Sequence, residues 1–139
     1  MSAGRLDWVS APVTQPLRGE VRVPGDKSIS HRAFIFGLLT IGETRIEGLL
    51  EGDDVLRTGA ACRALGAAVE RRGEGAWRVR GAGLGSLLAP RDTLDFGNAG
   101  TGSRLMMGVV GGHAITAGIV GMDLIDTGCH RRVKRRCRQ

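Results

Sequence analysis

The sequence predicts an α/β fold made of repeated β-α-β-α-β-β units, of which the second is incomplete. Short strand-like runs alternate with longer helix-like runs, an order typical of α/β proteins. The phrase Pro-Gly-Asp-Lys-Ser-Ile-Ser-His-Arg at 24–32 returns in related form as Gly-Asn-Ala-Gly-Thr-Gly-Ser-Arg at 97–104, with the same spacing between its first glycine and its arginine. Each phrase follows a strand-like run and leads into a helix-like run, so the recurrence indicates a repeated supersecondary unit.

The first unit is expected to begin with a strand at residues 20–23, which Pro24 ends because proline has no N–H to donate to a ladder. A helix from about Ser28 to Thr40 follows. It is apolar on nearly every face, so we expect it to be buried on all sides. Gly42 is expected to close this helix.

The rest of the first unit is predicted to contain a strand, a helix and a hairpin. Residues 43–47 alternate like a half-exposed strand. Asp53 or Asp54 is expected to cap a second helix, whose alanines and glycines favour close helix packing. Residues 68–71 and 76–80 flank a Gly-Glu-Gly turn and predict a hairpin.

The same order restarts with a strand at 93–96, a helix at about 101–110 and a strand at about 113–120. From Gly121 onward the pattern is not continued, so we expect a truncated chain. The predicted organisation is a lead-in segment, 1–19; a partial domain, 20–120, with unit one at 20–91 and incomplete unit two at 92–120; and a divergent basic tail, 121–139.

The net charge of +6 is concentrated at one end of the chain. Residues 1–129 carry equal numbers of basic and acidic side chains, so the whole excess lies in residues 130–139. Such a tail either binds nucleic acid or another anionic surface, or is a solvated terminus. The neutral body and the isolation of Trp8 and Trp77, which form no stacking platform, argue against a nucleic-acid partner.

The cysteines do not predict a disulfide framework, because their number is odd. Cys62 lies in an alanine-rich helical pattern and is expected in the core. Cys129, His130 and Cys137 offer at most three metal ligands at no recognised spacing, so no metal site is expected. No secretory signal and no membrane-spanning run is recognised, and the expected location is cytoplasmic.

The two repeated phrases have the composition of anion-binding sites. Glycines and small hydroxyl residues lie at each predicted helix start, where unpaired N–H groups and the helix dipole favour negative charge. Neither phrase fits a P-loop or a dinucleotide-binding fingerprint. In the first phrase, Lys27 offers a compact charge suited to a phosphate and Arg32 a fork suited to a carboxylate. The alternative is an ordinary capped helix with both side chains in solvent.

Two further roles stay open at this point. Asp53 and Asp54 are explained as helix caps, although a carboxylate beside an anion site could position a lysine. His31 is either a general base or a structural hydrogen-bonding residue, and the sequence assigns it neither role.

Three phrases, at residues 24–33, 48–55 and 94–105, resemble the 5-enolpyruvylshikimate-3-phosphate (EPSP) synthase family in order and spacing. The resemblance covers roughly residues 20–120, and the first phrase separates this family from the sugar-nucleotide enolpyruvyl transferases. It implies the inside-out α/β fold of the enolpyruvyl transferases, in which two domains each contain a pseudo-threefold set of units. Helices lie inside each domain, sheets lie outside, and the active site lies in the cleft between domains.

The implied reaction transfers enolpyruvyl from phosphoenolpyruvate to shikimate 3-phosphate, with release of phosphate, in chorismate biosynthesis. No metal or organic cofactor is implied. By the resemblance, the substrate-binding residues are Lys27, Ser28, Arg32, Asn98, Gly100 and Thr101. Lys27 is also the implied catalytic residue, because it would bind the phosphoenolpyruvate phosphate and touch both substrates. Ser28 and Arg32 would hold shikimate 3-phosphate, and Asn98 and Gly100 would shape the phosphoenolpyruvate pocket.

Glyphosate-tolerant relatives often carry alanine in place of Gly100, so the resemblance implies a glyphosate-sensitive pocket.

The sequence departs from the family pattern after residue 120. Residues 126–133 contain no Arg-Pro-Met phrase, so no residue here is assigned the arginine that grips phosphoenolpyruvate in the family. We expect an N-terminal portion of a synthase, produced by natural truncation or by a frame error, and inactive alone. The alternatives are a non-catalytic anion-binding module, a fragment that complements a separate remainder, and a nucleic-acid binder acting through residues 130–139.

Overall fold

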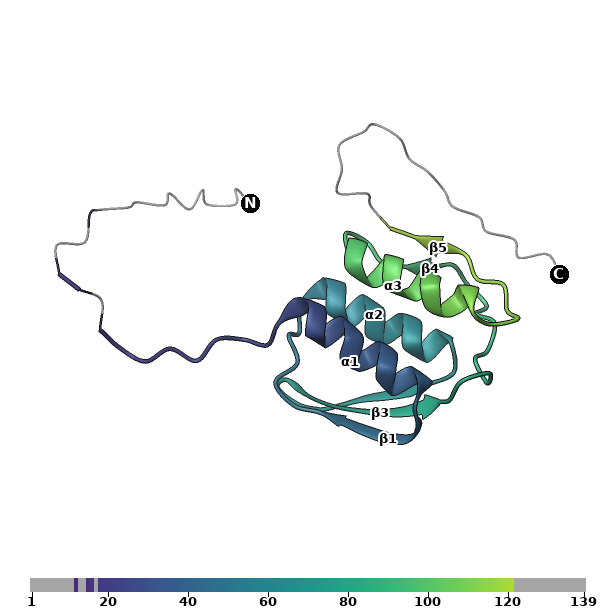
Figure 1. Cartoon of the computed structure of the whole chain (residues 1–139), viewed down its shortest axis with the longest axis horizontal. Helices are drawn as coiled ribbons and strands as arrows, with labels where there is room; N and C mark the ends of the chain where they lie inside the picture. The colour runs from purple at the N-terminus through teal and green to yellow at the C-terminus, as the bar shows by residue number, and fades with distance from the viewer. Residues whose placement is uncertain (1–11, 13–14, 17, 122–139) are drawn as a thin grey trace, which may run out of the picture.

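The computed structural model describes residues 12, 15–16 and 18–121. Three helices lie side by side, with a three-stranded sheet against α1 and α2 and a two-stranded sheet beside α3 (Figure 1). The predicted α/β class is confirmed. Residues 122–139 of the predicted basic tail, which include Cys129, His130 and Cys137, lie outside the described residues.

The first helix, α1, spans Lys27–Leu39 and confirms the predicted helix to within one residue. It begins where Asp26 Oδ1 accepts a hydrogen bond from the Ile29 N–H at 2.7 Å, a side-chain cap that satisfies one of the first unpaired donors. It ends at Thr40, whose N–H donates to the Phe36 carbonyl at 3.0 Å. The predicted closure by Gly42 is wrong, because Gly42 already lies in the following strand.

That strand, β1, spans Ile41–Ile46, and the second helix, α2, spans Asp53–Ala64. The N-cap of α2 is Gly52, so the predicted capping by Asp53 or Asp54 is wrong. Both carboxylates lie instead in the first turn, where the positive end of the helix dipole favours them.

The predicted hairpin is confirmed. It consists of β2 (Ala68–Gly73) and β3 (Ala76–Ala82), which pair antiparallel. The sheet order is β1-β3-β2, and β1 is antiparallel to β3. Strand β3 therefore lies in the middle of the sheet, paired with β2 on one side and with β1 on the other.

The second unit contains β4 (Leu94–Asp95), α3 (Gly100–Gly111) and β5 (Ile119–Val120). The two strands pair in parallel, with Leu94 opposite Ile119. The strands predicted at 93–96 and 113–120 are present but shorter, because only two residues of each find a hydrogen-bonding neighbour.

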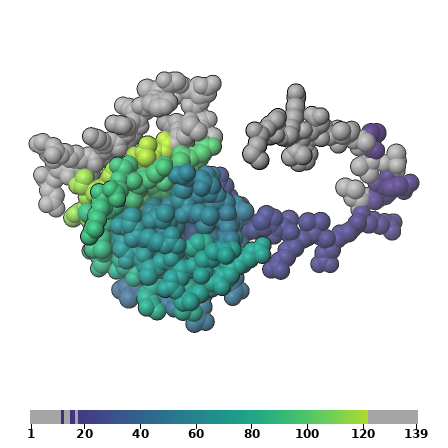
Figure 2. Space-filling model, turned by 180° about the vertical axis from the view of Figure 1, so that it is seen from behind, coloured from purple at the N-terminus to yellow at the C-terminus, as the bar shows by residue number. Residues whose placement is uncertain are grey.

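The strand predicted at residues 20–23 does not form among the described residues. The segment extends away from the body (Figures 1 and 2), and the side chains of Val21 and Val23 are 82% and 76% exposed. An alternating pattern gives a strand only where a neighbouring strand supplies hydrogen bonds.

The core lies between the helices and the three-stranded sheet and continues between α3 and the two-stranded sheet. Its largest fully buried side chains include Phe34, Leu38, Val55, Leu65, Val79, Phe96 and Met106. The ring of Phe34 meets that of Trp77 edge to face, with centroids 5.3 Å apart. Helix α1 is not buried on all sides, however: Ile29 is 67% exposed and Phe36 is 64% exposed. The expectation of burial all round is therefore wrong for this one face.

Cys62 is a fully buried core residue, as the sequence predicts. Burial raises the pKa of its thiol to about 12. Among the described residues, no helix has both the length and the apolar character needed to cross a membrane.

Candidate anion-binding site

The helices α1, α2 and α3 all begin at the same end of the helix layer (Figure 1). This end carries both repeated phrases, since residues 24–32 lead into α1 and residues 97–104 lead into α3. Three parallel helix starts place three partial positive charges on one side of the molecule. The repeat therefore becomes a single region of the surface rather than two distant sites.

Lys27 is the first residue of α1, and its ammonium forms an ion pair with a carboxylate oxygen of Asp54 in the first turn of α2. The Lys27 side chain remains 52% exposed, whereas Asp54 is only 18% exposed. The less exposed Asp54 thus holds a lysine whose side chain remains half exposed. The sequence had left open whether Asp53 or Asp54 positions a lysine, and the ion pair agrees with that role for Asp54.

Arg32 lies one turn further along α1 and is exposed. Its guanidinium donates a hydrogen bond to the Ser28 carbonyl at 3.0 Å, and no described carboxylate pairs with it. A guanidinium held by one neutral acceptor keeps most of its donors for a ligand. Lys27, Ser28 and Arg32 are therefore neighbours on one helix start.

The loop before α2 is tied to α1 by Ser30. The Ser30 hydroxyl donates to the Asp26 carbonyl at 2.8 Å and accepts from the Leu50 N–H at 3.0 Å. Gly25 packs directly against this loop, because a Cβ placed on it would lie 2.0 Å from the Gly48 carbonyl oxygen. Only glycine permits so close an approach of two backbones.

Glu51 anchors the same loop to the β2–β3 hairpin. Its carboxylate accepts hydrogen bonds from Arg71 at 2.7 and 2.8 Å, from the Trp77 indole at 2.8 Å and from the Gly75 N–H at 3.2 Å. Arg71, followed by the other donors, lowers the pKa of Glu51 to about 2. The carboxylate therefore stays ionised, and it fixes the loop that leads to Asp54.

The second phrase is held by Arg57 of α2. Its guanidinium binds Asp53 and Asp95, each at 2.8 Å, and thereby joins α2 to the end of β4. Asp95 in turn accepts from the Gly97 N–H at 2.7 Å. Gly97 has a φ of +52°, a left-handed conformation that favours glycine, and Arg57 covers it.

Asn98, Gly100 and Thr101 follow at the start of α3. Asn98 and Thr101 are exposed and Gly100 is partly buried. The N-cap of α3 is Ala99, which provides no side-chain hydrogen bond. The first N–H groups of α3 therefore lack the side-chain cap that Asp26 gives to α1, and such groups are suited to an anion.

His31 joins the three helices beneath this surface. It is fully buried, and its Nδ1 lies 2.8 Å from the Thr58 hydroxyl of α2. Gly102 of α3 packs on this pair, because a Cβ there would lie 2.6 Å from the Thr58 hydroxyl. Burial, followed by the charge of Lys27, lowers the pKa of His31, although Asp54 opposes the shift. The buried position of His31 is the one expected of a structural hydrogen-bonding residue.

The structure thus brings the six predicted residues to one end of the helix layer in two groups. Lys27, Ser28 and Arg32 belong to α1, and Asn98, Gly100 and Thr101 belong to the start of α3. No hydrogen bond or ion pair between described residues joins one group to the other. Sequence reasoning missed the anchoring residues Glu51, Arg57 and Thr58, whose partners lie far away in the chain.

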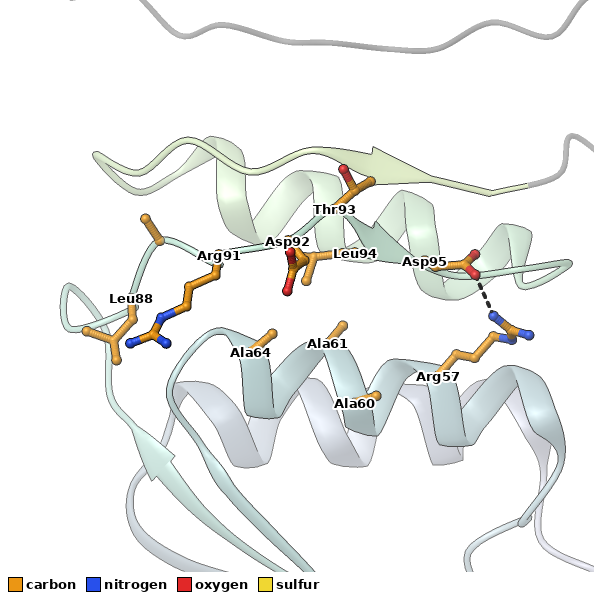
Figure 3. Close-up of a pocket in the computed structure, with 11 residues that line it drawn as sticks. Arg57, Ala60, Ala61, Ala64, Leu88, Arg91, Asp92, Thr93, Leu94 and Asp95 are labelled. Atoms are coloured by element: carbon orange, nitrogen blue, oxygen red, sulfur yellow. Dashed lines mark hydrogen bonds and ion pairs between the residues drawn. The ribbon is translucent and has the colours of Figure 1, made fainter.

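A cavity of about 500 Å³ lies elsewhere, between α2 and the segment 88–95. Figure 3 shows Arg57 and Asp95 paired at one end and Arg91 at the other. Its α2 side is formed by Ala60, Ala61 and Ala64. None of the six predicted residues lines it, so it is separate from the candidate anion-binding surface at the helix starts. Within the described residues, no cluster of His, Cys, Asp and Glu could hold a metal ion.

Known proteins match both the sequence and the fold. The family model of EPSP synthase (3-phosphoshikimate 1-carboxyvinyltransferase) matches residues 12–127. A 3-phosphoshikimate 1-carboxyvinyltransferase from Methylobacterium sp. (strain 4-46) is 63% identical over 134 residues, which cover 94% of this chain and 29% of the relative. The protein of the same name from Methylobacterium radiotolerans is 74% identical over 102 residues, which cover 73% of this chain and 23% of the relative.

A solved structure of EPSP synthase from Acinetobacter baumannii resembles the fold with a TM-score of 0.71 at 37% identity. The match covers 78% of this chain and 25% of that chain. The chain thus spans about a quarter of the length of the relatives that it matches. The family match over residues 12–127, together with these identities, shows that the chain belongs to the EPSP synthase family.

Proposed function

We propose that this chain binds shikimate 3-phosphate and phosphoenolpyruvate and forms one wall of the active site of a 3-phosphoshikimate 1-carboxyvinyltransferase. The observation that carries the proposal is the position of Lys27, which Asp54 holds at the start of α1 with its side chain half exposed. The surrounding helix starts add partial positive charge at the same end. Both substrates are anionic, so this surface suits them.

The proposed roles follow the chemistry of each group. Lys27 binds the phosphate of phosphoenolpyruvate as a compact charge and lies between the two substrates. Arg32 binds a carboxylate of shikimate 3-phosphate with the donors that Ser28 leaves free, and the Ser28 hydroxyl adds a hydrogen bond. Asn98, Gly100 and Thr101 border the phosphoenolpyruvate pocket, where the uncapped start of α3 faces the ligand.

The proposed reaction exchanges one bond for another without a redox step. The hydroxyl of shikimate 3-phosphate adds to the enol carbon of phosphoenolpyruvate, and the resulting tetrahedral adduct loses phosphate to give the enolpyruvyl ether. Cations and helix starts around the phosphate stabilise the charge on the leaving group. The proton transfers to and from carbon require acid and base groups beyond those identified on this wall.

Isothermal titration calorimetry of the 139-residue chain with shikimate 3-phosphate tests the binding proposal. We expect saturable binding that Lys27→Met weakens at least tenfold. Arg80→Met is the matched control, because Arg80 is 70% exposed and pairs with Glu43 across the sheet rather than at the helix starts. Equal affinities for the two variants, or no saturable binding by the unchanged chain, would contradict the proposal.

A second function, complementation of a separate remainder, is supported by the exposed face of α1. Ile29 and Phe36 are 67% and 64% exposed on a helix whose other faces are buried, an arrangement that favours further packing. Co-expression with the remaining three quarters of a homologous synthase should give phosphate release from the two substrates. Phe36→Asp should abolish this release without unfolding the chain. Phosphate release that is insensitive to Phe36→Asp would exclude this face as the contact.

A further inference from the structure

The imidazole of His31 is polar in a place where packing alone would favour an apolar side chain. His31 is fully buried, and its Nε2 has no hydrogen-bond partner among the described residues. A buried polar atom without a partner is unfavourable. The contact made by the other ring nitrogen must therefore offset this cost.

The other nitrogen, Nδ1, makes a buried polar contact that links α1 to α2. It lies 2.8 Å from the Thr58 hydroxyl, which itself donates to the Asp54 carbonyl at 3.3 Å. Because the hydroxyl proton is used there, the geometry assigns the proton of a neutral His31 to Nδ1, which donates to Thr58. The bond thus reaches the turn of α2 that carries Asp54, the partner of Lys27.

Helix α3 packs against the hydrogen-bonded pair of His31 and Thr58 at Gly102. A Cβ on Gly102 would lie 2.6 Å from the Thr58 hydroxyl and 3.1 Å from His31 Nδ1. The backbone of α3 therefore seats on the His31–Thr58 pair itself, just after Gly100 and Thr101. A change in this pair must move the start of α3 relative to α1.

The charged groups around the junction favour a neutral ring. Lys27 and Arg32 of α1 both oppose protonation of His31, and Asp54 of α2 favours it. A neutral imidazole provides the hydrogen bond without bringing another positive charge beneath the anion-binding surface.

We propose that His31 is a positioning residue: its hydrogen bond to Thr58, covered by Gly102, sets the start of α3 relative to Lys27 and Ser28 at the start of α1. The proposal rests on the proposed function only in taking these two helix starts as the substrate-binding groups. His31 itself contacts no substrate. Its role is to fix the distance between the two halves of the surface.

The test compares four variants of the 139-residue chain by amide chemical shifts and by affinity for shikimate 3-phosphate. His31→Phe keeps an aromatic ring without the hydrogen bond, Thr58→Val removes the hydroxyl with little change in shape, and His31→Asn keeps a donor near the position of Nδ1. Cys62→Ala is the matched control, since it removes buried volume one turn further along α2 without touching the junction.

We expect His31→Phe and Thr58→Val to shift the amides of residues 98–101 and of Lys27 and Ser28, and to weaken binding at least tenfold. His31→Asn should restore most of both, and Cys62→Ala should lower the melting temperature without shifting residues 98–101. If His31→Phe does not fold, Thr58→Val decides. Unchanged amides at 98–101 in a folded Thr58→Val chain would overturn the proposal. Absence of binding by the unchanged chain would refute the proposed function alone, because the amide comparison needs no ligand.

Discussion

Lys27 and Asp54 form an ion pair that joins the start of α1 to the start of α2. The pair gives the lysine a fixed position at the end of the molecule where the three helices begin. An exposed lysine without such a partner would sample many rotamers, and a ligand would have to order it at a cost in affinity. The pair is thus better understood as preorganisation than as a source of stability.

Asp54→Asn should separate these two effects. Because Lys27 is half exposed, loss of the pair should lower the free energy of unfolding by no more than about 1 kcal/mol. Affinity for phosphoenolpyruvate should fall about tenfold, since the ammonium loses its anchor. Urea denaturation and calorimetric titration measure the two quantities. An affinity equal to that of the unchanged chain would show that Asp54 does not position Lys27.

The Glu51 clamp should make stability depend on acid pH. The pKa of Glu51 is about 2 in the folded chain, below its usual value of 4.5. A lowered carboxyl pKa contributes stability that is complete above the unfolded value and declines as the pH falls from about 4.5 toward 2. Urea denaturation between pH 7 and pH 3 should therefore show a steeper decline for the unchanged chain than for Glu51→Gln.

Glu70→Gln serves as the control for that experiment, because Glu70 is 54% exposed and, among the described residues, forms an ion pair only with Arg72. It should leave the acid limb of the stability curve unchanged. If Glu51→Gln and Glu70→Gln gave the same pH dependence, the clamp would not be the origin of the acid sensitivity.

The contact between Gly25 and the loop before α2 should be intolerant of a single methyl group. In Gly25→Ala the new Cβ would lie 2.0 Å from the Gly48 carbonyl oxygen, so one of the two backbones must move. We expect a loss of at least about 1–3 kcal/mol in the free energy of unfolding. Gly108→Ala is the matched control, because nothing lies within 4 Å of its Cβ position in α3. Replacing a mid-helix glycine there should stabilise the chain by about 0.5–1 kcal/mol. Similar effects of the two substitutions would refute the close contact.

Cys62 should be chemically inert in the folded chain. Its thiol is buried and has a pKa of about 12, so almost no thiolate is present at neutral pH. In a Cys129→Ser, Cys137→Ser background, reaction with a thiol reagent should proceed only as fast as the chain opens, and should accelerate in urea. Rapid reaction under native conditions would contradict the burial of Cys62.

The sequence predicted the helices and the hairpin because their patterns depend on neighbouring residues. The apolar run after Lys27 and the Gly-Glu-Gly turn between residues 72 and 76 are local signals. The two repeated phrases likewise indicated a repeated unit, and the helices that they precede begin at the same end of the molecule.

What the sequence could not predict depends on partners distant along the chain. The strand expected at 20–23 has the right alternation, but no described strand pairs with it. Capping by Asp54 was plausible locally, yet Lys27 binds that carboxylate from another helix. The His31–Thr58 bond gives no sequence signal at all, because neither residue type implies the other.

If the proposed function is right, the two repeated phrases form one anion-binding surface. The most direct measurement is a titration of the isotopically labelled chain with shikimate 3-phosphate, followed by amide chemical shifts. We expect saturable shifts with a single dissociation constant at Lys27 and Ser28 and at residues 98–101. Lys27→Met should weaken both sets together. Shifts confined to one phrase, or no saturable shift at either, would contradict it.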